Sequence, residues 1–339
     1  MSQTRVMAWA RWVLAAVGVV AIAWFVWRSD PQSIVASLAR LGWAAPLVLA
    51  PYAVVYAFDT LGWLMAFHPG AIRGVSWARL YVVRWCGEAV NQVVPSGYVG
   101  GEAVKALILR RDGAPELEAT SSVVVGKTLQ SLAQAGFIAL GSWCALAYLP
   151  AESGARTGMM AAMAGSAVVV GGLFWVQSRG LFGSAGSILG RIPGLSASWL
   201  GWEAQARRLD GLISGYYREH RGRFAASAGL FFGGWVFDCV ELLLVVDLMG
   251  VEMDLRMALA IESFIGVSKA IGFFVPGALG VQETGVVLLF RLFGLPEPEA
   301  MSYALIRRGR EVVFAMAGWC LLYREGFSFS RLRLAGGKG

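Results

Sequence analysis

Charged residues are scarce in this sequence of 339 residues, at 15% against roughly 25% in an ordinary soluble domain. This scarcity excludes a soluble enzyme. The charges that remain gather in short loops between apolar stretches long enough for a bilayer core of about 30 Å. We therefore interpret the chain as a polytopic membrane protein. Its net charge of +7 follows the rule that cytoplasmic loops carry Lys and Arg, and we expect no nucleic-acid partner.

Histidines, cysteine motifs and nucleotide-binding loops are few or missing. The two histidines, His68 and His220, lie away from the buried acids, and no H-E-x-x-H string occurs. Four cysteines fall in apolar segments without C-x-x-C spacing, which favours buried thiols: Cys86, Cys144, Cys239 and Cys320. No G-x4-G-K-[ST] loop is present, and Tyr98 stands where a lipid-phosphate phosphatase needs histidine after P-S-G. We therefore predict no metal, no cofactor and no enzymatic activity.

Six apolar stretches are long enough to cross a membrane: residues 12–27, 44–67, 119–148, 157–177, 224–250 and 300–323. The first has no small-residue cleavage motif after it, so we expect it to be retained. Residues 33–43 have the apolar spacing of a short interfacial helix. Two further apolar regions, 76–109 and 255–290, are broken midway by Pro95 and by Pro276-Gly277. The predicted fold class is an all-α integral membrane protein with about six full spans and two broken-helix hairpins.

The chain repeats itself at an offset of 181 residues, with 11 identities in 28 aligned positions. Val94, Pro95, Glu102, Leu107, Arg110, Gly113, Pro115, Glu116, Glu118, Ala119 and Ser121 recur as Val275, Pro276, Glu283, Leu288, Arg291, Gly294, Pro296, Glu297, Glu299, Ala300 and Ser302. We divide the single transmembrane domain into N-terminal spans with the interfacial helix (1–75), repeat A (76–149), connecting spans with a basic cytoplasmic segment (150–253), repeat B (254–323) and a basic tail (324–339).

Counting crossings predicts that the two repeats are inverted. Each broken region returns to its own side, and three spans lie between the copies, so the second copy has the opposite orientation, as in many transporter folds. With the N-terminus inside, seventeen basic residues are cytoplasmic, five are external and seven lie within the membrane. This asymmetry predicts that both termini are cytoplasmic. We expect a multi-pass protein of a bacterial cytoplasmic (inner) membrane.

Seven basic residues fall at membrane depth: Arg84, Lys105, Lys127, Lys269, Arg307, Arg308 and Arg310. Exposed to lipid they would cost on the order of 20 kcal/mol, so they must be paired or line a hydrated cavity. Eight acids at similar depth could pair with them: Asp59, Glu88, Glu102, Asp238, Glu241, Glu262, Glu283 and Glu311. One interpretation is a set of ion pairs that only fixes helix packing, and the other is a ligand site.

The repeat favours a ligand site near the midplane. Lys127 and Arg308 each lie roughly 15 Å beyond a loop, and the interrupted helices expose N–H groups that suit a phosphate. An isolated broken helix would more often be a kink without a ligand. The predicted headgroup-binding set is Lys127, Arg308, Ser96, Gly97, Gly100, Gly101, Lys105 and Arg307. The predicted charge-balancing or proton-carrying set is Glu88, Glu102, Glu283 and Glu311, and the helix breaks involve Pro95, Pro276, Gly277, Gly280 and Asn91.

Residues 88–106, E-A-V-N-Q-V-V-P-S-G-Y-V-G-G-E-A-V-K-A, and 275–285, V-P-G-A-L-G-V-Q-E-T-G, resemble the flippase-like transmembrane family. That family is named for the membrane region of lysylphosphatidylglycerol synthases and has stand-alone members, some associated with hopanoid biosynthesis. The resemblance covers about residues 76–323, and the positions that match the family motif are Asn91, Pro95, Gly100, Gly101, Glu102, Pro276, Gly280 and Glu283. It implies a protein that moves or handles a membrane lipid. Lys105 stands where the family usually has arginine, which loses the bidentate fork.

The function we expect is a lipid transporter or flippase that binds an anionic or phosphorylated headgroup in a midplane cavity. Only sixteen residues follow Tyr323 and carry no aminoacyl-transferring domain, so we expect no lysyl-lipid synthesis by this chain. Two alternatives stay open. One is a non-catalytic accessory protein for a lipid-biosynthetic enzyme, for example in hopanoid or glycolipid synthesis, docked on the basic segment 178–222. The other is a membrane enzyme acting on a polyprenyl-phosphate lipid.

Overall fold

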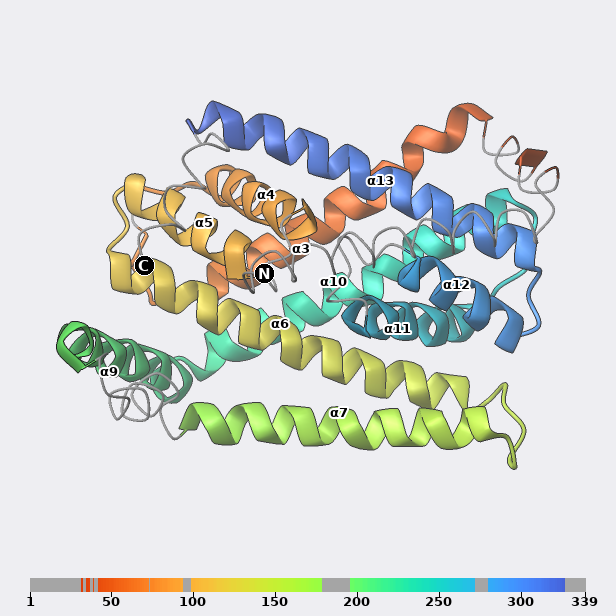
Figure 1. Cartoon of the computed structure of the whole chain (residues 1–339). Helices are drawn as coiled ribbons and strands as arrows, with labels where there is room; N and C mark the ends of the chain where they lie inside the picture. The colour runs from red at the N-terminus through yellow and green to blue at the C-terminus, as the bar shows by residue number, and fades with distance from the viewer. Residues whose placement is uncertain are drawn as a thin grey trace, which may run out of the picture.

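The computed structural model describes residues 42–326, with gaps at 73, 94–98, 179–195 and 272–279, and isolated positions 32, 35, 36 and 39. Every element within these residues is a helix (Figure 1). The prediction of an all-α chain is therefore confirmed for the described part. The expected first span at 12–27, most of the interfacial helix at 33–43 and the tail beyond residue 326 lie outside it.

The helices follow the predicted stretches closely. In order they are η1 (Gly42–Val48), α3 (Leu49–Met65), α4 (Trp77–Val93), α5 (Val99–Arg111), α6 (Glu116–Ala145), α7 (Gly154–Ser178), α9 (Ser196–Glu219), α10 (Arg221–Leu248), α11 (Leu255–Ile271), α12 (Val281–Leu292) and α13 (Glu297–Arg324). Three segments of the described residues are long and apolar enough to span a membrane: Pro46–Met65, Glu116–Ala145 and Arg221–Leu248. The total of about six full spans stays a prediction.

The turns that end α5 and α12 show the internal repeat at atomic level. Gly113 and Gly294 have φ angles of +94° and +74°, a left-handed conformation that glycine adopts without steric cost. The same hydrogen bond closes both turns: Ala114 N–H to the Leu109 carbonyl at 3.0 Å, and Leu295 N–H to the Phe290 carbonyl at 2.8 Å. A proline then begins the next long helix in each copy. The repeated sequence therefore makes the same helix–turn–helix corner twice.

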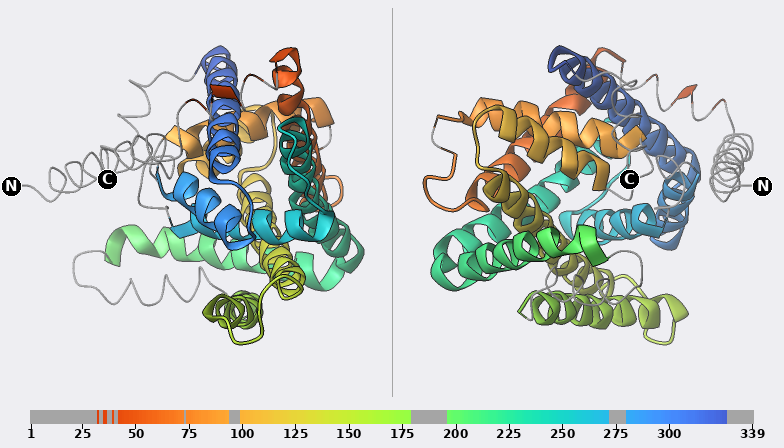
Figure 2. Two further views of the ribbon diagram at one scale, coloured as in Figure 1. Left: turned by 90° about the vertical axis from the view of Figure 1, so that its right-hand side faces the viewer. Right: turned by 60° about the vertical axis from the view of Figure 1, so that its left-hand side comes forward.

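The two corners lie at opposite ends of the helix bundle (Figures 1 and 2). At one end, Arg79 at the start of α4 bonds Asp112 after α5, at 2.7 Å, and Glu325 after α13, at 2.8 Å. This contact lowers the pKa of Glu325. At the other end, Tyr148 after α6 bonds Asp254 before α11 at 2.6 Å, which lowers the pKa of Asp254. The helices α6 and α13 run in opposite directions, which is the geometry that an inverted repeat requires.

The long third helix of each repeat packs against the first helix of the other repeat. Helix α13 lies along α4, and α6 lies along α11, while each also contacts the short helix of its own copy. Helix α9 packs at one end against α6, α7 and α10. There the Tyr216 hydroxyl donates to the Met65 carbonyl at 2.8 Å, and Arg223 donates to carbonyls at the end of α3. Because the long helices of the two repeats pack against each other's first helices, α4, α6, α11 and α13 surround one central space together with α3 and α10.

The inverted arrangement predicts labelling from opposite sides of the membrane. Gly113 and Gly294 are unsuitable positions for cysteine because their φ angles are positive. Glu116 and Glu297 are equivalent in the repeat and begin α6 and α13. In a background with the exposed Cys320 replaced, Glu116→Cys and Glu297→Cys should react with a membrane-impermeant maleimide from opposite faces. Labelling of both from one face would contradict the inversion.

The cysteine prediction is wrong at one position. Cys86, Cys144 and Cys239 are buried free thiols as expected, but Cys320 is exposed. Helix α13 turns its cysteine away from the bundle, on a face that also exposes Met316. Composition of the segment alone could not tell an inward face from a lipid-facing one.

Helices α3 and α10 cross tightly beside the central space. A Cβ added at Gly62 would lie 3.1 Å from the ring of Phe231, so a side chain at residue 62 would require that ring to shift. Phe58 packs on Phe237, with ring centroids 5.8 Å apart. Each phenylalanine precedes an aspartate, so the crossing directs two Phe-Asp pairs, one from each helix, toward the same region.

Candidate functional site

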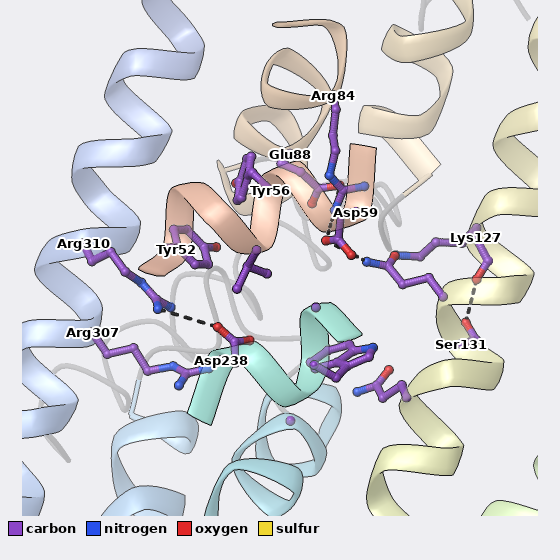
Figure 3. Close-up of a pocket in the computed structure, with 16 residues that line it drawn as sticks. Tyr52, Tyr56, Asp59, Arg84, Glu88, Lys127, Ser131, Asp238, Arg307 and Arg310 are labelled. Carbon is purple, nitrogen blue, oxygen red and sulfur yellow. Dashed lines mark hydrogen bonds and ion pairs between the residues drawn. The ribbon is translucent and has the colours of Figure 1, made fainter. Parts of the chain in front are cut away.

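A cavity of about 310 Å³ lies at the centre of the bundle, between α3, α4, α6, α10, α11 and α13 (Figure 3). Its charged lining residues are Asp59, Arg84, Glu88, Lys127, Asp238, Arg307 and Arg310. Its uncharged polar and aromatic lining residues are Tyr52, Tyr56, Gln130, Ser131, Gln134 and Trp235, with Val55, Gly234 and Gly266 completing it. Four cations against three carboxylates give the lining an excess of one positive charge.

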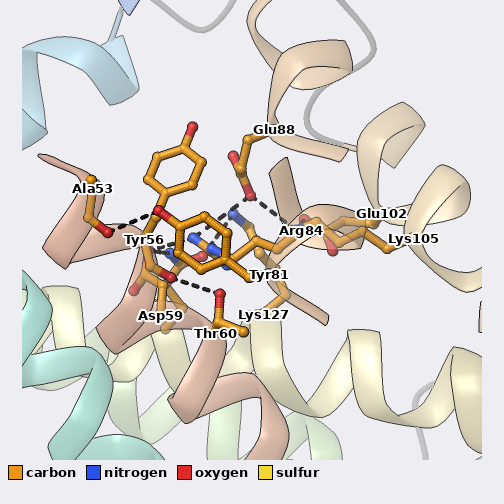
Figure 4. A network of polar contacts seen from close by, with 11 residues as sticks. Ala53, Tyr56, Asp59, Thr60, Tyr81, Arg84, Glu88, Glu102, Lys105 and Lys127 are labelled. Atoms are coloured by element: carbon orange, nitrogen blue, oxygen red, sulfur yellow. Dashed lines mark hydrogen bonds and ion pairs between the residues drawn. The ribbon is translucent and has the colours of Figure 1, made fainter. Parts of the chain in front are cut away.

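One wall of the cavity is an ion-pair network from α3, α4 and α5 (Figure 4). The Arg84 guanidinium donates to the Asp59 carboxylate and lies 3.8 Å from Glu88. Behind it, Lys105 Nζ donates to Glu88 and Glu102, each at 2.9 Å. Both Arg84 and Lys105 are at least nine-tenths buried. Charge pairing of this kind is what permits these residues at membrane depth.

The opposite wall is built from α10, α11 and α13. Arg307 donates to Glu262 at 2.5 Å and to the Tyr303 hydroxyl at 2.9 Å. Arg310 donates to Glu241 and lies 3.6 Å from the centroid of the Tyr52 ring, a close cation–π contact. The two arginines are three residues apart, so they lie on one face of α13 and reach the same cavity.

Several polar atoms of the lining have no hydrogen-bond partner among the described residues, although they are buried. They include the Nε atoms of Arg84, Arg307 and Arg310, the Nε1 of Trp235 and the Oδ1 of Asp238. Leaving a buried polar group unsatisfied costs roughly 1 to 3 kcal/mol. Four donors and one acceptor of the lining residues therefore lack a partner that a bound ligand or a water molecule would supply.

The structure separates the predicted headgroup-binding residues into two groups. Lys127 and Arg307 line the cavity together with Glu88 from the predicted acidic set. Lys105 and Glu102 lie next to it, where they meet Arg84 and Lys127 around a much smaller space. Ser96, Gly97, Pro95, Pro276 and Gly277 fall outside the described residues, and so does the side chain of Lys269. Their predicted roles stay predictions.

Arg308 lies in a carboxylate clamp and is not among the described residues that line the cavity. It donates to Glu283 at 2.7 Å and to Glu311 at 2.8 Å. Its equivalent in repeat A, Lys127, contacts Gln130 at 3.2 Å, and Gln130 is itself the equivalent of Glu311. In each copy the cation therefore contacts the residue three positions later in the helix. That residue is a carboxylate, Glu311, in repeat B and a neutral amide, Gln130, in repeat A.

Asn91 and the paired glycines hold the first broken hairpin closed. The Gly101 N–H donates to Asn91 Oδ1 at 2.9 Å. A Cβ on Gly101 would lie 2.2 Å from the Gly87 carbonyl oxygen, so α5 can approach α4 this closely only with glycine there. In the second copy, Gly280 has a φ of +78° and its N–H donates to Glu283 at 2.8 Å. These contacts give the N-x3-P-S-G-x-x-G-G-E string a packing role beside any role in binding.

Gly101→Ala should lower the free energy of unfolding by about 1 to 3 kcal/mol, because neither backbone can move aside for the added methyl group. Gly136→Ala on α6 is a matched control, since its Cβ would lie 3.7 Å from the ring of Phe232, an ordinary contact. The measurement is thermal unfolding of both variants in detergent. Equal midpoints for the two variants would show that the close approach of α4 and α5 is not required.

Sequence reasoning placed Asp59, Arg84, Asp238 and Arg310 at membrane depth but did not assign them to the site, and it did not single out Trp235. A signal was present in the sequence. Phe58-Asp59 recurs as Phe237-Asp238 at an offset of 179, two residues from the offset of the main repeat. The shift of two residues hid this match from an ungapped alignment.

Comparisons with known proteins add a family assignment. No curated protein and no solved structure matches the chain. The model of the family described as the lysylphosphatidylglycerol synthase TM region matches residues 11–318, a range that includes every residue lining the cavity. This family consists of membrane proteins linked to lipid biosynthesis or modification. The chain therefore belongs to the family of the lysylphosphatidylglycerol synthase TM region.

Proposed function

We propose that this protein moves a lipid across the membrane by binding its anionic or phosphorylated headgroup in the central cavity. The observation that carries the proposal is the lining itself, in which Arg84, Lys127, Arg307 and Arg310 surround a space of about 310 Å³. Three of these residues present a guanidinium Nε without a partner among the described residues. A phosphate offers several acceptor oxygens to such donors and matches the planar geometry of arginine.

The size of the cavity supports a headgroup rather than a whole lipid as the bound part. A volume of about 310 Å³ is at the lower end of ligand pockets. The acyl chains would then stay in the bilayer while the polar group passes through the bundle.

The carboxylates of the network would offset the energetic cost of the buried cations while no headgroup is bound. Glu88, Glu102 and Asp59 balance Arg84 and Lys105 on one side of the cavity, and Glu262 and Glu241 pair with Arg307 and Arg310 on the other. Movement would follow from rocking of the inverted halves about the cavity, as in other inverted-repeat transporters. The driving force would come from a gradient, a partner or the lipid itself, and the protein would act without catalysing a covalent step.

The family and the apolar helices fit a multi-pass membrane protein. Within that statement, we propose the bacterial cytoplasmic membrane, with both termini on the cytoplasmic side, because the basic residues gather on the loops of that side. A lipid-biosynthetic enzyme that supplies the lipid is the partner this proposal implies. Hopanoid synthesis is one such setting, on the resemblance to stand-alone members alone.

The proposal is tested by titrating the purified protein in a neutral detergent with a short-chain anionic phospholipid. The comparison is a diacylglycerol with the same chains and no phosphate. The anionic lipid should bind at least tenfold more tightly, and its affinity should fall as salt is added, because screening weakens its attraction to the cations. Equal affinity for the two lipids at low salt would overturn the proposal.

A further inference from the structure

Helices α3 and α13 meet at the edge of the cavity through large side chains. The Tyr52 ring of α3 contacts the Phe314 ring of α13 edge to face, with centroids 4.7 Å apart. Phe314 also lies 5.3 Å from the Tyr56 ring. On the cavity side, the Arg310 guanidinium lies 3.6 Å from the centroid of the Tyr52 ring, and Figure 3 shows these two side chains next to each other. We call the border formed by Tyr52, Tyr56 and Phe314 the aromatic seam.

Other borders of the cavity are closed by the close approach of helix backbones. A Cβ on Gly318 of α13 would lie 3.0 Å from the Trp85 carbonyl oxygen of α4. A Cβ on Gly141 of α6 would lie 2.8 Å from the Leu259 carbonyl oxygen of α11. At these glycines a gap can form only if a whole helix moves, because no side chain separates the two backbones. At the aromatic seam, a change of side-chain rotamer is enough to open a gap between helices that stay in place.

The aromatic seam is also distinct from the two larger apolar cores of the described bundle. Its buried apolar residues are Tyr52, Val55, Tyr56 and Phe314, and none of them belongs to either core. A small cluster of this kind opens at a lower free energy than a large core, because fewer contacts are lost. Val313, next to Phe314, is 41% exposed, so the seam lies directly beneath the outer surface of the bundle.

A lipid that places its headgroup in the cavity must pass between two of the lining helices. The cavity of about 310 Å³ holds a headgroup, and the acyl chains stay outside the bundle. The part of the lipid that joins them therefore crosses a border between helices. At the inner side of the aromatic seam stands Arg310, which is 3% exposed and lines the cavity. Its guanidinium is the first cation that an anionic group meets after it passes the rings.

We propose that the aromatic seam is the lateral entry site for the lipid, where the Tyr52 and Phe314 rings separate and Arg310 receives the headgroup. This inference rests on the proposed function, in which the cavity holds the headgroup. It gives Phe314 control over the rate of entry and no part in holding the bound headgroup, because Phe314 is not among the described residues that line the cavity.

The experiment compares how fast two probes bind to the full chain in a neutral detergent: a short-chain anionic phospholipid and inorganic phosphate. Stopped-flow tryptophan fluorescence follows binding, since Trp235 lines the cavity. Phe314→Ala should raise the association rate of the phospholipid roughly threefold to tenfold, because the ring no longer closes the seam. The rate and the affinity for phosphate, which has no chains and enters from water, should not change.

Phe290→Ala on α12 is the matched control. Phe290 is also a buried phenylalanine, stacked on Tyr303 with centroids 6.1 Å apart, and it is not among the described residues that line the cavity. This variant should bind both probes at the wild-type rates. If Phe314→Ala does not fold, Phe314→Leu provides the same test, because it removes the ring and keeps an apolar side chain.

The outcomes separate the entry site from the binding site. Phospholipid that binds wild type and the folded Phe314 variant at the same rate would overturn the entry site and leave the proposed function intact. Equal acceleration of phosphate would also overturn it, because the ring would then close a route from water. Equal acceleration of the phospholipid in Phe290→Ala would show a general loosening of the bundle and would overturn it too. Failure of wild type to bind either probe would overturn the proposed function and this inference together.

Discussion

Replacing Glu262 with leucine should lower the free energy of unfolding by about 3 to 5 kcal/mol, because the change leaves the buried guanidinium of Arg307 without its carboxylate. Glu262 is 2% exposed and Arg307 is 6% exposed, and their 2.5 Å contact joins α11 to α13. Tyr303 also loses the carboxylate that accepts a hydrogen bond from its hydroxyl group. Reversible unfolding in detergent against a denaturant measures this effect.

The double variant Glu262→Leu with Arg307→Met distinguishes an uncompensated charge from a loss of packing. It removes both charges and replaces them with apolar side chains of similar volume, so most of the lost stability should return. The same variant should bind an anionic headgroup more weakly than wild type, because Arg307 lines the cavity. A double variant less stable than Glu262→Leu would contradict this explanation. It would show that the intact ion pair stabilises the fold, and that the unpaired guanidinium is not the cause of the loss.

Lys127→Met should weaken binding of an anionic headgroup roughly tenfold to a hundredfold, because it removes a charged donor from the cavity lining. The matched variant is Arg308→Met at the equivalent position of repeat B. Arg308 pairs with Glu283 and Glu311, so its loss should lower stability while the folded protein keeps its affinity. Titration with a short-chain anionic phospholipid measures both.

A comparable loss of affinity in Arg308→Met, with the protein still folded, would contradict the division of roles between the two positions. It would favour the symmetric site that the sequence predicts, in which both cations hold the headgroup. Thermal unfolding of each variant provides the control, since a change of affinity counts only in a protein that unfolds as cooperatively as wild type.

The sequence was informative about helices because their causes are local. Apolar runs set the extents of α6 and α10, and the repeated glycine and proline corners set the ends of α5 and α12. Even the need to pair the buried cations followed from the cost of charge in a membrane. These features depend on residues that are near one another along the chain.

The partners within the network could not be predicted in the same way. Arg307 and Arg308 are adjacent in sequence, yet one lines the cavity and the other is held by Glu283 and Glu311. Successive residues of an α-helix point about 100° apart, so the outcome depends on how α13 is rotated against α10 and α12. That rotation is set by contacts between distant segments, such as the packing of Trp85 on Phe314.

The central claim is that a headgroup crosses through the cavity, and translocation in proteoliposomes tests it most directly. The protein is reconstituted with a trace of head-labelled anionic phospholipid, and the fraction of label that becomes accessible from outside is followed over time. Wild type should move the label faster than protein-free vesicles, and Lys127→Met should abolish most of that increase. Equal rates for wild type, Lys127→Met and empty vesicles would contradict the account and favour an accessory role in lipid synthesis.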